Sequence, residues 1–248
     1  MIKKAHQRKI RELKSTTDTG GLFGNPENPD IKDAELKEIN YQTAKLIIEE
    51  YEWLGTMGTT QFHYGIFYNK ILAGVVCFGY FQSPNGYANY IGEKYNKKGV
   101  QLTRGACVHW AHPHSGSKLI AYGLKKMAEK GYKYVIAFSD SDAGEIGTLY
   151  QATNWFYVGR TKLIHYELYK TDGRKYMDAR DIYKRIGIDS KSRKRIQEYA
   201  TQNNLIVKPL APKARYIKLI GDKRENKEMM KTLKDRILPY PKRVNYFD

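Results

Sequence analysis

The stretch RGACVHWAHPHSGSKLIAYGLKKM, residues 104–127, changes its periodicity in the middle and thereby decides the fold. Residues 99–110, which include the beginning of this stretch, are rich in strand-forming side chains, so we predict a strand there. After the loop, apolar residues recur at helical spacing, namely Leu119, Ile120, Tyr122, Leu124 and Met127. Gly131 then supplies a stop signal, so we predict a helix over 116–131.

The loop between this strand and this helix suits an anion. The start of a helix presents unpaired N–H groups and the positive end of a dipole, and small residues let a ligand approach the backbone. Ser115, Gly116 and Ser117 stand at that point and favour a phosphate cradle. A serine there also suits a helix cap, and the two roles are compatible. The loop lacks the GK[ST] ending of a Walker P-loop.

The segments around this stretch alternate between helical and strand patterns. We expect a helix over 33–55, a hairpin over 63–81, a strand over 132–140, a helix over 143–154 and a strand over 155–170. This order predicts an α/β domain, a mixed central sheet flanked by helices, over residues 31–170. Residues 1–30 then form a basic segment and linker, and residues 171–248 a basic C-terminal extension.

The charge of the chain is segregated. The net charge is +17, yet residues 15–170 hold 16 Lys and Arg against 15 Asp and Glu. Residues 1–14 hold six basic residues against one acidic, and residues 171–248 hold 21 against ten. Two basic ends on a near-neutral core favour a polyanionic partner, nucleic acid first, although solvated surface charges explain the composition as well. The basic extension, interleaved with tyrosines, suits contact with nucleic acid or a helical cover for the sheet.

Composition also restricts the location of the protein. No apolar run approaches the roughly 18 residues that a membrane span needs, and the N-terminus lacks the apolar part of a secretory signal. The two cysteines, Cys77 and Cys107, lie in apolar strand-like runs and are interpreted as small buried hydrophobes in a reducing cytoplasm.

Three histidines crowd the loop, and they leave three interpretations open. His109, His112 and His114, with Asp140 or Asp142, are residue types that hold iron or zinc, although their spacing fits no standard ligand motif. A single histidine suits a general base, because an imidazole titrates near neutral pH. Alternatively, these side chains only pack and hydrogen-bond.

The run FSDSD, residues 138–142, ends a predicted buried strand, where α/β folds place ligand sites. Continued alternation puts Asp140 and Asp142 on one side. Two carboxylates beside a basic tail suit a magnesium-dependent nuclease, but caps for the next helix are the commoner role.

At this point the organisation resembles the GNAT acetyltransferase superfamily. That family places the pyrophosphate of CoA on the loop between a central strand and the next helix, which implies acetyl-CoA at Ser115, Gly116, Ser117 and Lys118. His114 departs from the pattern, because it stands where the family has a glycine. The later run GTLYQATNWFYVGRT, residues 147–161, resembles the family's helix–strand pair. The resemblance implies that Tyr150 protonates the departing thiolate; otherwise Tyr150 is one core aromatic among 21 tyrosines.

A narrower resemblance covers most of the chain. The runs YEWLGTMG (51–58), RGACVHWAHPHSGSK (104–118) and FSDSDAGEIGTLYQATNWFYVGRT (138–161), with the basic tail, are similar to the phage Mom family. Members convert DNA adenine to N6-carbamoylmethyladenine, which protects phage DNA from restriction. The implied active region comprises Arg104, Ser117, Asp140 or Asp142, Tyr150 and Tyr51.

The product that this resemblance implies requires more than a simple acyl transfer. A carbamoylmethyl group joins N6 through a CH₂ carbon and carries an amide nitrogen, whereas acetyl transfer joins N6 to a carbonyl carbon. A nitrogen donor, or a metal or radical step, is therefore also required. Two other functions remain open: a CoA-dependent N-acetyltransferase for a protein, tRNA or small amine, and a non-catalytic DNA-binding protein.

Overall fold

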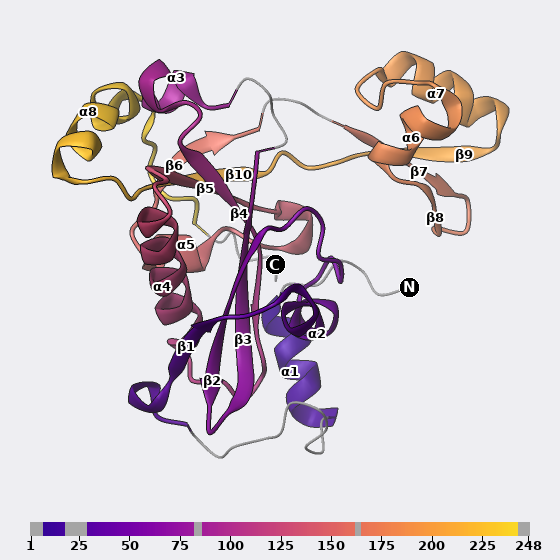
Figure 1. The fold of residues 1–248 in the computed structure, drawn as a ribbon. Coiled ribbons are helices and arrows are strands. Elements are labelled where there is room, and N and C mark those ends of the chain that lie inside the picture. The colour runs from indigo at the N-terminus through magenta and orange to yellow at the C-terminus, as the bar shows by residue number, and fades with distance from the viewer. Residues whose placement is uncertain (1–6, 18–28, 82–85, 162–164, 243–248) are drawn as a thin grey trace.

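A computed structural model describes residues 7–17, 29–81, 86–161 and 165–242. Within these residues the main feature is a seven-stranded mixed sheet with the strand order β1-β2-β3-β4-β5-β10-β6. Its strands are β1 (Glu35–Glu38), β2 (Phe62–Tyr68), β3 (Ile71–Gly79), β4 (Gly99–Cys107), β5 (Tyr134–Ser139), β6 (Phe156–Arg160) and β10 (Ala214–Leu219). The predicted α/β architecture with a mixed central sheet is confirmed (Figure 1).

Helices cover both faces of this sheet. α2 (Tyr41–Tyr51) packs on β2, β3 and β4 from one face, and α4 (Ser115–Glu129) packs on the same strands from the other (Figure 1). The other helices around the main sheet are α1 (Gln7–Thr17), which packs on α2, α3 (Ala88–Ile91), α5 (Thr148–Ala152) and α8 (Lys223–Leu233), which packs on α3. Short 3-10 turns are η1 (Ile31–Asp33), η2 (Glu93–Tyr95), η3 (Ser141–Ala143) and η4 (Lys234–Arg236).

Local sequence explains where α2 begins and which face it buries. The Asn40 side chain accepts a hydrogen bond from the Thr43 N–H at 2.8 Å, which satisfies one of the free donors of the first turn. Its buried residues recur at helical spacing and face the sheet: Ala44, Ile47, Ile48 and Tyr51. Burying side chains of this size stabilises the fold by about 1.5–3 kcal/mol for each large one.

The two parallel strands β4 and β5 pair only where they begin. Gly99–Gln101 pair with Tyr134–Ile136, and the ladder extends no further. On the other side of β4, the register against β3 shifts between Cys77 and Phe78, which makes β4 bulge at Thr103. The later half of β4 therefore stays with β3 and leaves β5, which opens the sheet beside the start of α4.

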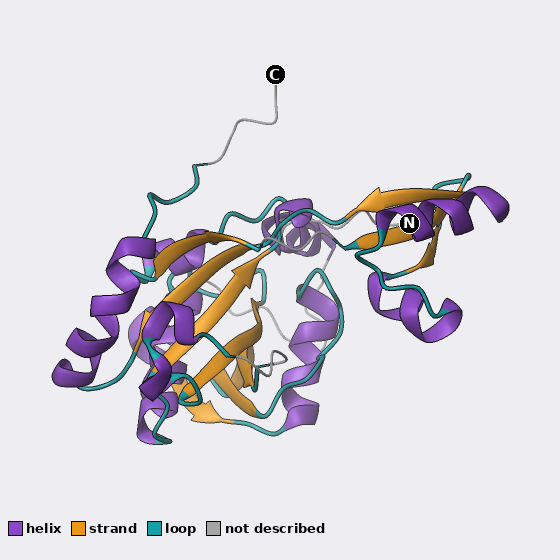
Figure 2. Cartoon of the chain, turned by 90° about the horizontal axis from the view of Figure 1, so that it is seen from above, coloured by secondary structure: helices purple, strands orange, loops and turns teal. Residues whose placement is uncertain are grey.

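A second, smaller sheet is inserted between β6 and β10. It has the order β8-β7-β9 and is antiparallel, with strands β7 (Tyr166–Lys170), β8 (Lys175–Met177) and β9 (Leu205–Pro209). α6 (Ala179–Ile186) and α7 (Arg193–Gln202) complete an apolar core with it. We call residues 165–210 the arm, because it stands to one side of the main sheet in two perpendicular views (Figures 1 and 2).

Three boundaries differ from the sequence-based prediction. The domain was expected to end at residue 170, with 171–248 as an appended extension; instead, the chain returns from the arm and inserts β10 between β5 and β6. The helix expected over 33–55 begins only at Tyr41, because Glu35–Glu38 pair with β2 as an edge strand. The single strand expected over 155–170 is two strands, β6 and β7, that belong to different sheets.

No helix in the described part of the chain is long and apolar enough to cross a membrane.

Candidate functional site

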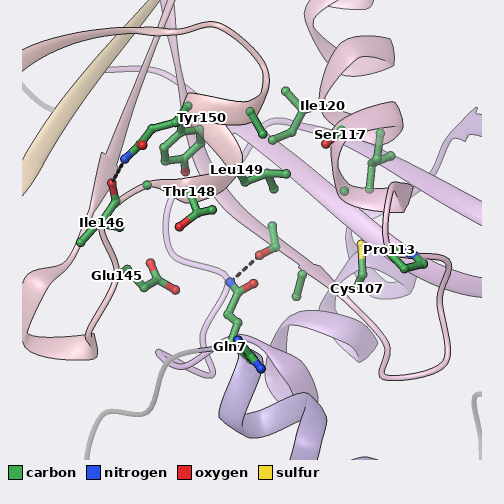
Figure 3. A pocket seen from close by; sticks show the side chains of 18 of the residues that line it. Gln7, Cys107, Pro113, Ser117, Ile120, Glu145, Ile146, Thr148, Leu149 and Tyr150 are labelled. Atoms are coloured by element: carbon green, nitrogen blue, oxygen red, sulfur yellow. Dashed lines mark hydrogen bonds between the residues drawn. The ribbon is translucent and has the colours of Figure 1, made fainter. Parts of the chain in front are cut away.

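A cavity of about 1280 Å³ lies between the later half of β4, the start of α4 and the segment that follows β5. α1 and residues 239–242 contribute the remaining walls. Figure 3 shows Glu145, Thr148 and Tyr150 on one side of this space, with Cys107, Pro113 and Ser117 on the other. The cavity is as large as sites that hold a cofactor-sized ligand.

The first turn of α4 splits the predicted cofactor residues into two groups. Gly116 and Ser117 line the cavity. Ser115 is fully buried instead, and its Oγ lies 2.8 Å from the Tyr68 hydroxyl. Lys118 points elsewhere, because its ammonium donates to the carbonyl of Ile31. The helix caps on His114 without a side-chain hydrogen bond, so neither serine caps it.

Gly116 leaves room that a larger residue would fill. A Cβ atom at this position would lie 3.2 Å from the Leu149 side chain, across the wall of the cavity. The N–H groups of Gly116 and Ser117 belong to the first turn, where no intrahelical acceptor exists. The predicted cradle therefore consists of backbone N–H groups at the positive end of a 15-residue helix.

Tyr150 is both a core aromatic and a wall of the cavity. Its ring packs against Trp155, at 5.1 Å between centroids, and against Tyr216, at 5.3 Å. Burial raises the pKa of Tyr150, and the nearby carboxylates of Glu145 and Glu52 raise it further. The phenol therefore keeps its proton at neutral pH and is able to donate it.

Glu145 is a candidate that sequence reasoning missed. It lines the cavity in the loop between η3 and α5. Burial, followed by the negative charges of Glu52 and Asp140, raises the pKa of Glu145 to about 7. A carboxyl group of this kind exchanges protons near neutral pH, as a general base must. The signal in the sequence was a lone Glu between two glycines, Gly144 and Gly147, which both adopt positive φ.

The two predicted aspartates serve the backbone. β5 ends at Ser139, and Asp140 caps η3 by accepting from the Asp142 N–H at 3.0 Å. Asp142 accepts from the Ala211 N–H at 3.0 Å and thereby attaches the segment that follows the arm to the end of η3. Neither lines the cavity, and the expected strand alternation stops before them, so they do not form a carboxylate pair on one side. Asp140 still acts on the site through its charge on Glu145.

Arg104 holds the loop after α2 against β4. Its Nε donates to the Thr56 carbonyl at 2.6 Å, and its Nη1 donates to the Thr103 carbonyl at 2.7 Å. It packs on Gly58, where a Cβ atom would come within 2.8 Å of Nη2. Arg104 does not line the cavity, but its charge favours the ionised form of the buried Glu52.

Tyr51 and His109 form a pair at the end of α2. The Tyr51 hydroxyl lies 3.0 Å from His109 Nδ1, and the two rings are stacked. His109 lines the cavity, whereas Tyr51 is buried behind it. Tyr51 is therefore placed to orient His109 rather than to touch a ligand.

The histidines do not assemble into a metal site in the described part of the chain. His112 Nδ1 accepts from the His114 N–H at 3.1 Å, and His109 Nδ1 contacts Tyr51. Across the described residues, no group of three or more His, Cys, Asp and Glu side chains is arranged to hold a metal ion. The predicted iron or zinc set of His109 and His112 with an aspartate therefore does not fit this donor geometry.

α1 closes the cavity beside β4, although the sequence suggested only a basic segment there. Gln7 Nε2 donates to the Gly105 carbonyl at 2.7 Å (Figure 3). Arg11 donates to the carbonyls of His109 and Ala111 at 3.2 and 3.3 Å. Arg8, Glu12 and Arg11 line the cavity, and because Arg8 pairs with Glu12 at 2.7 Å, Arg11 carries the net positive charge.

Cys107 also lines the cavity, whereas Cys77 is buried as predicted. Burial raises the pKa of Cys107 to about 11. The thiol is therefore protonated at neutral pH, and a thiolate nucleophile is disfavoured.

Comparison with known proteins adds sequence evidence. The sequence profile of the Mom protein family matches residues 33–242. Methylcarbamoylase mom of Escherichia phage Mu is 28% identical over 152 residues, which are 58% of this chain and 60% of that relative. The chain thus matches three fifths of the length of this curated relative.

Several solved acetyltransferase structures are similar to this chain, with low TM-scores and low sequence identity. An IAA acetyltransferase from Bacillus cereus has a TM-score of 0.42 and 12% identity, over 75% of this chain and 99% of the other. An N-acetyltransferase from Staphylococcus aureus has a TM-score of 0.42 and 11% identity, over 75% and 98%. A Bacillus subtilis acetyltransferase in complex with CoA has a TM-score of 0.38 and 12% identity, over 75% and 97%.

Proposed function

The chain belongs to the Mom protein family, and on that basis we propose that it is a transferase that converts DNA adenine to N6-carbamoylmethyladenine. The name of the phage Mu relative, a methylcarbamoylase, supports this chemistry. The structural observation that carries the proposal is a single cavity that brings together a carboxyl with a pKa near neutrality, a protonated phenol and the first turn of a helix.

The proposed reaction forms a bond between adenine N6 and a methylene carbon. Adenine gives up one N6 proton, and a donor of the class X–CH₂–C(O)NH₂ loses X, which leaves with that proton as HX. This balance places the amide nitrogen in the donor. An acetyl thioester alone does not give the product, because it offers N6 a carbonyl carbon and no nitrogen.

Three residues that line the cavity have proposed roles in this reaction. Adenine N6 is a weak nucleophile, because its lone pair is delocalised into the ring, so Glu145 accepts the proton as the bond forms. The Tyr150 phenol donates a proton to the leaving group. His109, oriented by Tyr51, offers a further polar contact at the wall.

The first turn of α4 fits the pyrophosphate of CoA. Gly116 provides the space, Gly116 and Ser117 provide N–H donors, and Arg11 provides positive charge at the same cavity. Bound acetyl-CoA would supply an acyl group activated as a thioester, but it is not the donor X–CH₂–C(O)NH₂ of the bond-forming step, which carries its own amide nitrogen. A metal ion is not part of the proposed mechanism, because the histidines among the described residues do not fit a metal-binding set.

The proposed partner is double-stranded DNA. An adenine in a duplex is stacked and paired, so it has to leave the helix before its N6 reaches a cavity. The volume of about 1280 Å³ accommodates a nucleobase together with a donor. We propose that the protein acts in the host cytoplasm, where phage DNA is exposed to restriction enzymes.

Co-expression with a plasmid, followed by mass spectrometry of the digested nucleosides, tests the proposal. A nitrogen-containing adduct on deoxyadenosine is the expected result. Unmodified DNA, together with acetyl-CoA turnover on another amine, would instead identify an ordinary N-acetyltransferase. Unmodified DNA with salt-sensitive DNA binding and no CoA binding would identify a non-catalytic DNA-binding protein.

A further inference from the structure

The arm has a surface that the main sheet does not use. Its core is made by the three strands together with Ile182 of α6 and Ile196 and Ala200 of α7. At its base, the His165 carbonyl accepts from the Leu210 N–H, which brings the two ends of the arm together, and just beyond it Asp142 of the main domain accepts from the Ala211 N–H. The arm is therefore anchored next to the loop that carries Glu145, while its helices face outward (Figures 1 and 2).

The positive charge of the arm is concentrated on α7. Residues 165–210 hold 11 Lys and Arg against six Asp and Glu. Four basic residues lie at or just before the start of α7, and all four are exposed: Lys191, Arg193, Lys194 and Arg195. None of the four forms an ion pair with any of the residues that the structure describes.

The acidic residues of the arm are mostly engaged within it. Glu167 pairs with Lys175 at 2.7 Å, and Asp172 pairs with Arg174 at 2.6 Å. Asp178 accepts from the Asp181 N–H, and Asp189 accepts from the Lys191 N–H. These acids are held at the strands and turns, and residues 191–198 hold four basic residues against one acidic, Glu198, so the start of α7 stays net positive.

The outer face of α7 has the shape and chemistry of a DNA-reading helix. Its exposed residues recur at helical spacing and border a shallow hollow: Arg193, Lys194, Gln197, Glu198, Thr201 and Gln202. Ile196 and Ala200 face the arm's own core. A helix about 10–12 Å across fits the major groove, about 12 Å wide, where Arg and Gln side chains read base edges. The face carries no apolar side chain, which disfavours a membrane surface.

We propose that the outer face of α7 docks in the major groove of duplex DNA and selects the sequence that the enzyme modifies. Arg193 and Lys194 contact phosphates or guanine, and Gln197 reads a base edge. This inference rests on the proposed function, because it assigns the recognition of the DNA substrate to the arm and the chemistry to the cavity.

The test compares two charge-matched variants of the full chain. Arg193→Ala/Lys194→Ala removes two charges from the first turn of α7, and Lys223→Ala/Arg224→Ala removes two from the first turn of α8, on the main body. Binding to a labelled duplex is measured by fluorescence anisotropy over a range of salt concentrations. The α7 variant is expected to bind at least ~10-fold more weakly, with a salt dependence reduced by about two counterions, and the α8 variant less than ~2-fold more weakly.

Other readouts separate the possible failures. Gln197→Ala is expected to reduce discrimination between duplex sequences while keeping the salt dependence. Equal losses in the α7 and α8 variants, or stronger binding of an RNA hairpin than of the duplex, would overturn the inference. Nucleoside mass spectrometry is scored separately: unmodified DNA with α7-dependent binding overturns the proposed function alone, and modification with α7-independent binding overturns this inference alone.

Discussion

The hydroxyl of Tyr51 lies 3.0 Å from Nδ1 of His109, so a buried residue of α2 orients a histidine at the wall of the cavity. The stacked rings add a second restraint on the imidazole. This contact engages one of the two ring nitrogens of the imidazole. We therefore expect Tyr51 to act as a positioning residue through His109, whereas the sequence resemblance implied a direct role in the active region.

Tyr51→Phe removes this contact and keeps the packed ring. We expect turnover to fall by about tenfold, the effect of losing one orienting hydrogen bond of about 1.4 kcal/mol, while duplex binding is unchanged. The measurement is the initial rate of adenine modification by nucleoside mass spectrometry. In a His109→Ala background the same substitution should cause no further loss, and an equal loss there would show that Tyr51 does not act through His109.

Glu145 should make the reaction depend on pH near neutrality. As a base it must be ionised, so the rate is expected to rise as pH increases through about 7 and then to level off. Glu145→Gln should lower the rate by at least ~100-fold and abolish this rise. Rates measured from pH 5.5 to 8.5 check it, and an unchanged rise in the variant would assign the titration to another group.

The same carboxyl should also affect stability, with a definite sign. Its pKa is raised in the folded protein, so the folded state binds more protons than the unfolded state between about 4.5 and 7. Stability contributed by this group therefore falls as pH rises through that window. At pH 8, Glu145→Gln is expected to increase the free energy of unfolding by up to about 3 kcal/mol, and at pH 4 by little. Thermal melting at both pH values makes the comparison.

Arg104 is expected to contribute to the stability of the fold rather than directly to the chemistry. Arg104→Ala removes two charge-assisted hydrogen bonds to backbone carbonyls and the packing on Gly58. We expect a loss of about 2–3 kcal/mol in the free energy of unfolding, measured by urea titration. Arg104→Lys should recover only part of it, because an ammonium lacks the planar fork. A stable but inactive Arg104→Ala protein would restore a direct catalytic role.

Metal content distinguishes a metal site from the other interpretations of the histidines. Because the Nδ1 atoms of His109 and His112 are engaged by Tyr51 and by the His114 N–H, we expect the double variant His109→Ala/His112→Ala to retain the same iron and zinc content as the parent protein. Elemental analysis of both proteins, purified in parallel, gives the answer. Stoichiometric metal that is lost in the variant would reinstate the metal site.

Periodicity predicted the elements around the site better than the direction of individual side chains. The apolar spacing from Leu119 to Met127 identified α4, and of the five residues in that pattern all except Tyr122 are buried. The same pattern does not determine the rotation of the first turn, so it did not show that Ser115 faces Tyr68 while Ser117 faces the cavity. Pairing with distant strands decided other features: β1 became an edge strand despite a helix-like sequence, and β10 closed the sheet from beyond the arm.

Glu145 shows why some site residues stay hidden in a sequence. Its raised pKa depends on burial and on the charges of Glu52 and Asp140, which come from separate parts of the chain. A single sequence does not reveal such a meeting, because it arises only when the end of α2 and the end of β5 are placed together by the sheet. Tyr150, by contrast, stood within a recognisable run.

Tyr150→Phe tests whether the phenol is needed for chemistry or only for packing. The substitution keeps the ring between Trp155 and Tyr216, so folding should be preserved. If the phenol protonates the leaving group, turnover should fall by about 10²–10⁴-fold, with duplex affinity unchanged within about twofold. Initial rates and fluorescence anisotropy on the same preparation provide both values. Equal losses of rate and of binding would make Tyr150 a packing residue, and Tyr216→Phe is the matched control within the same aromatic cluster.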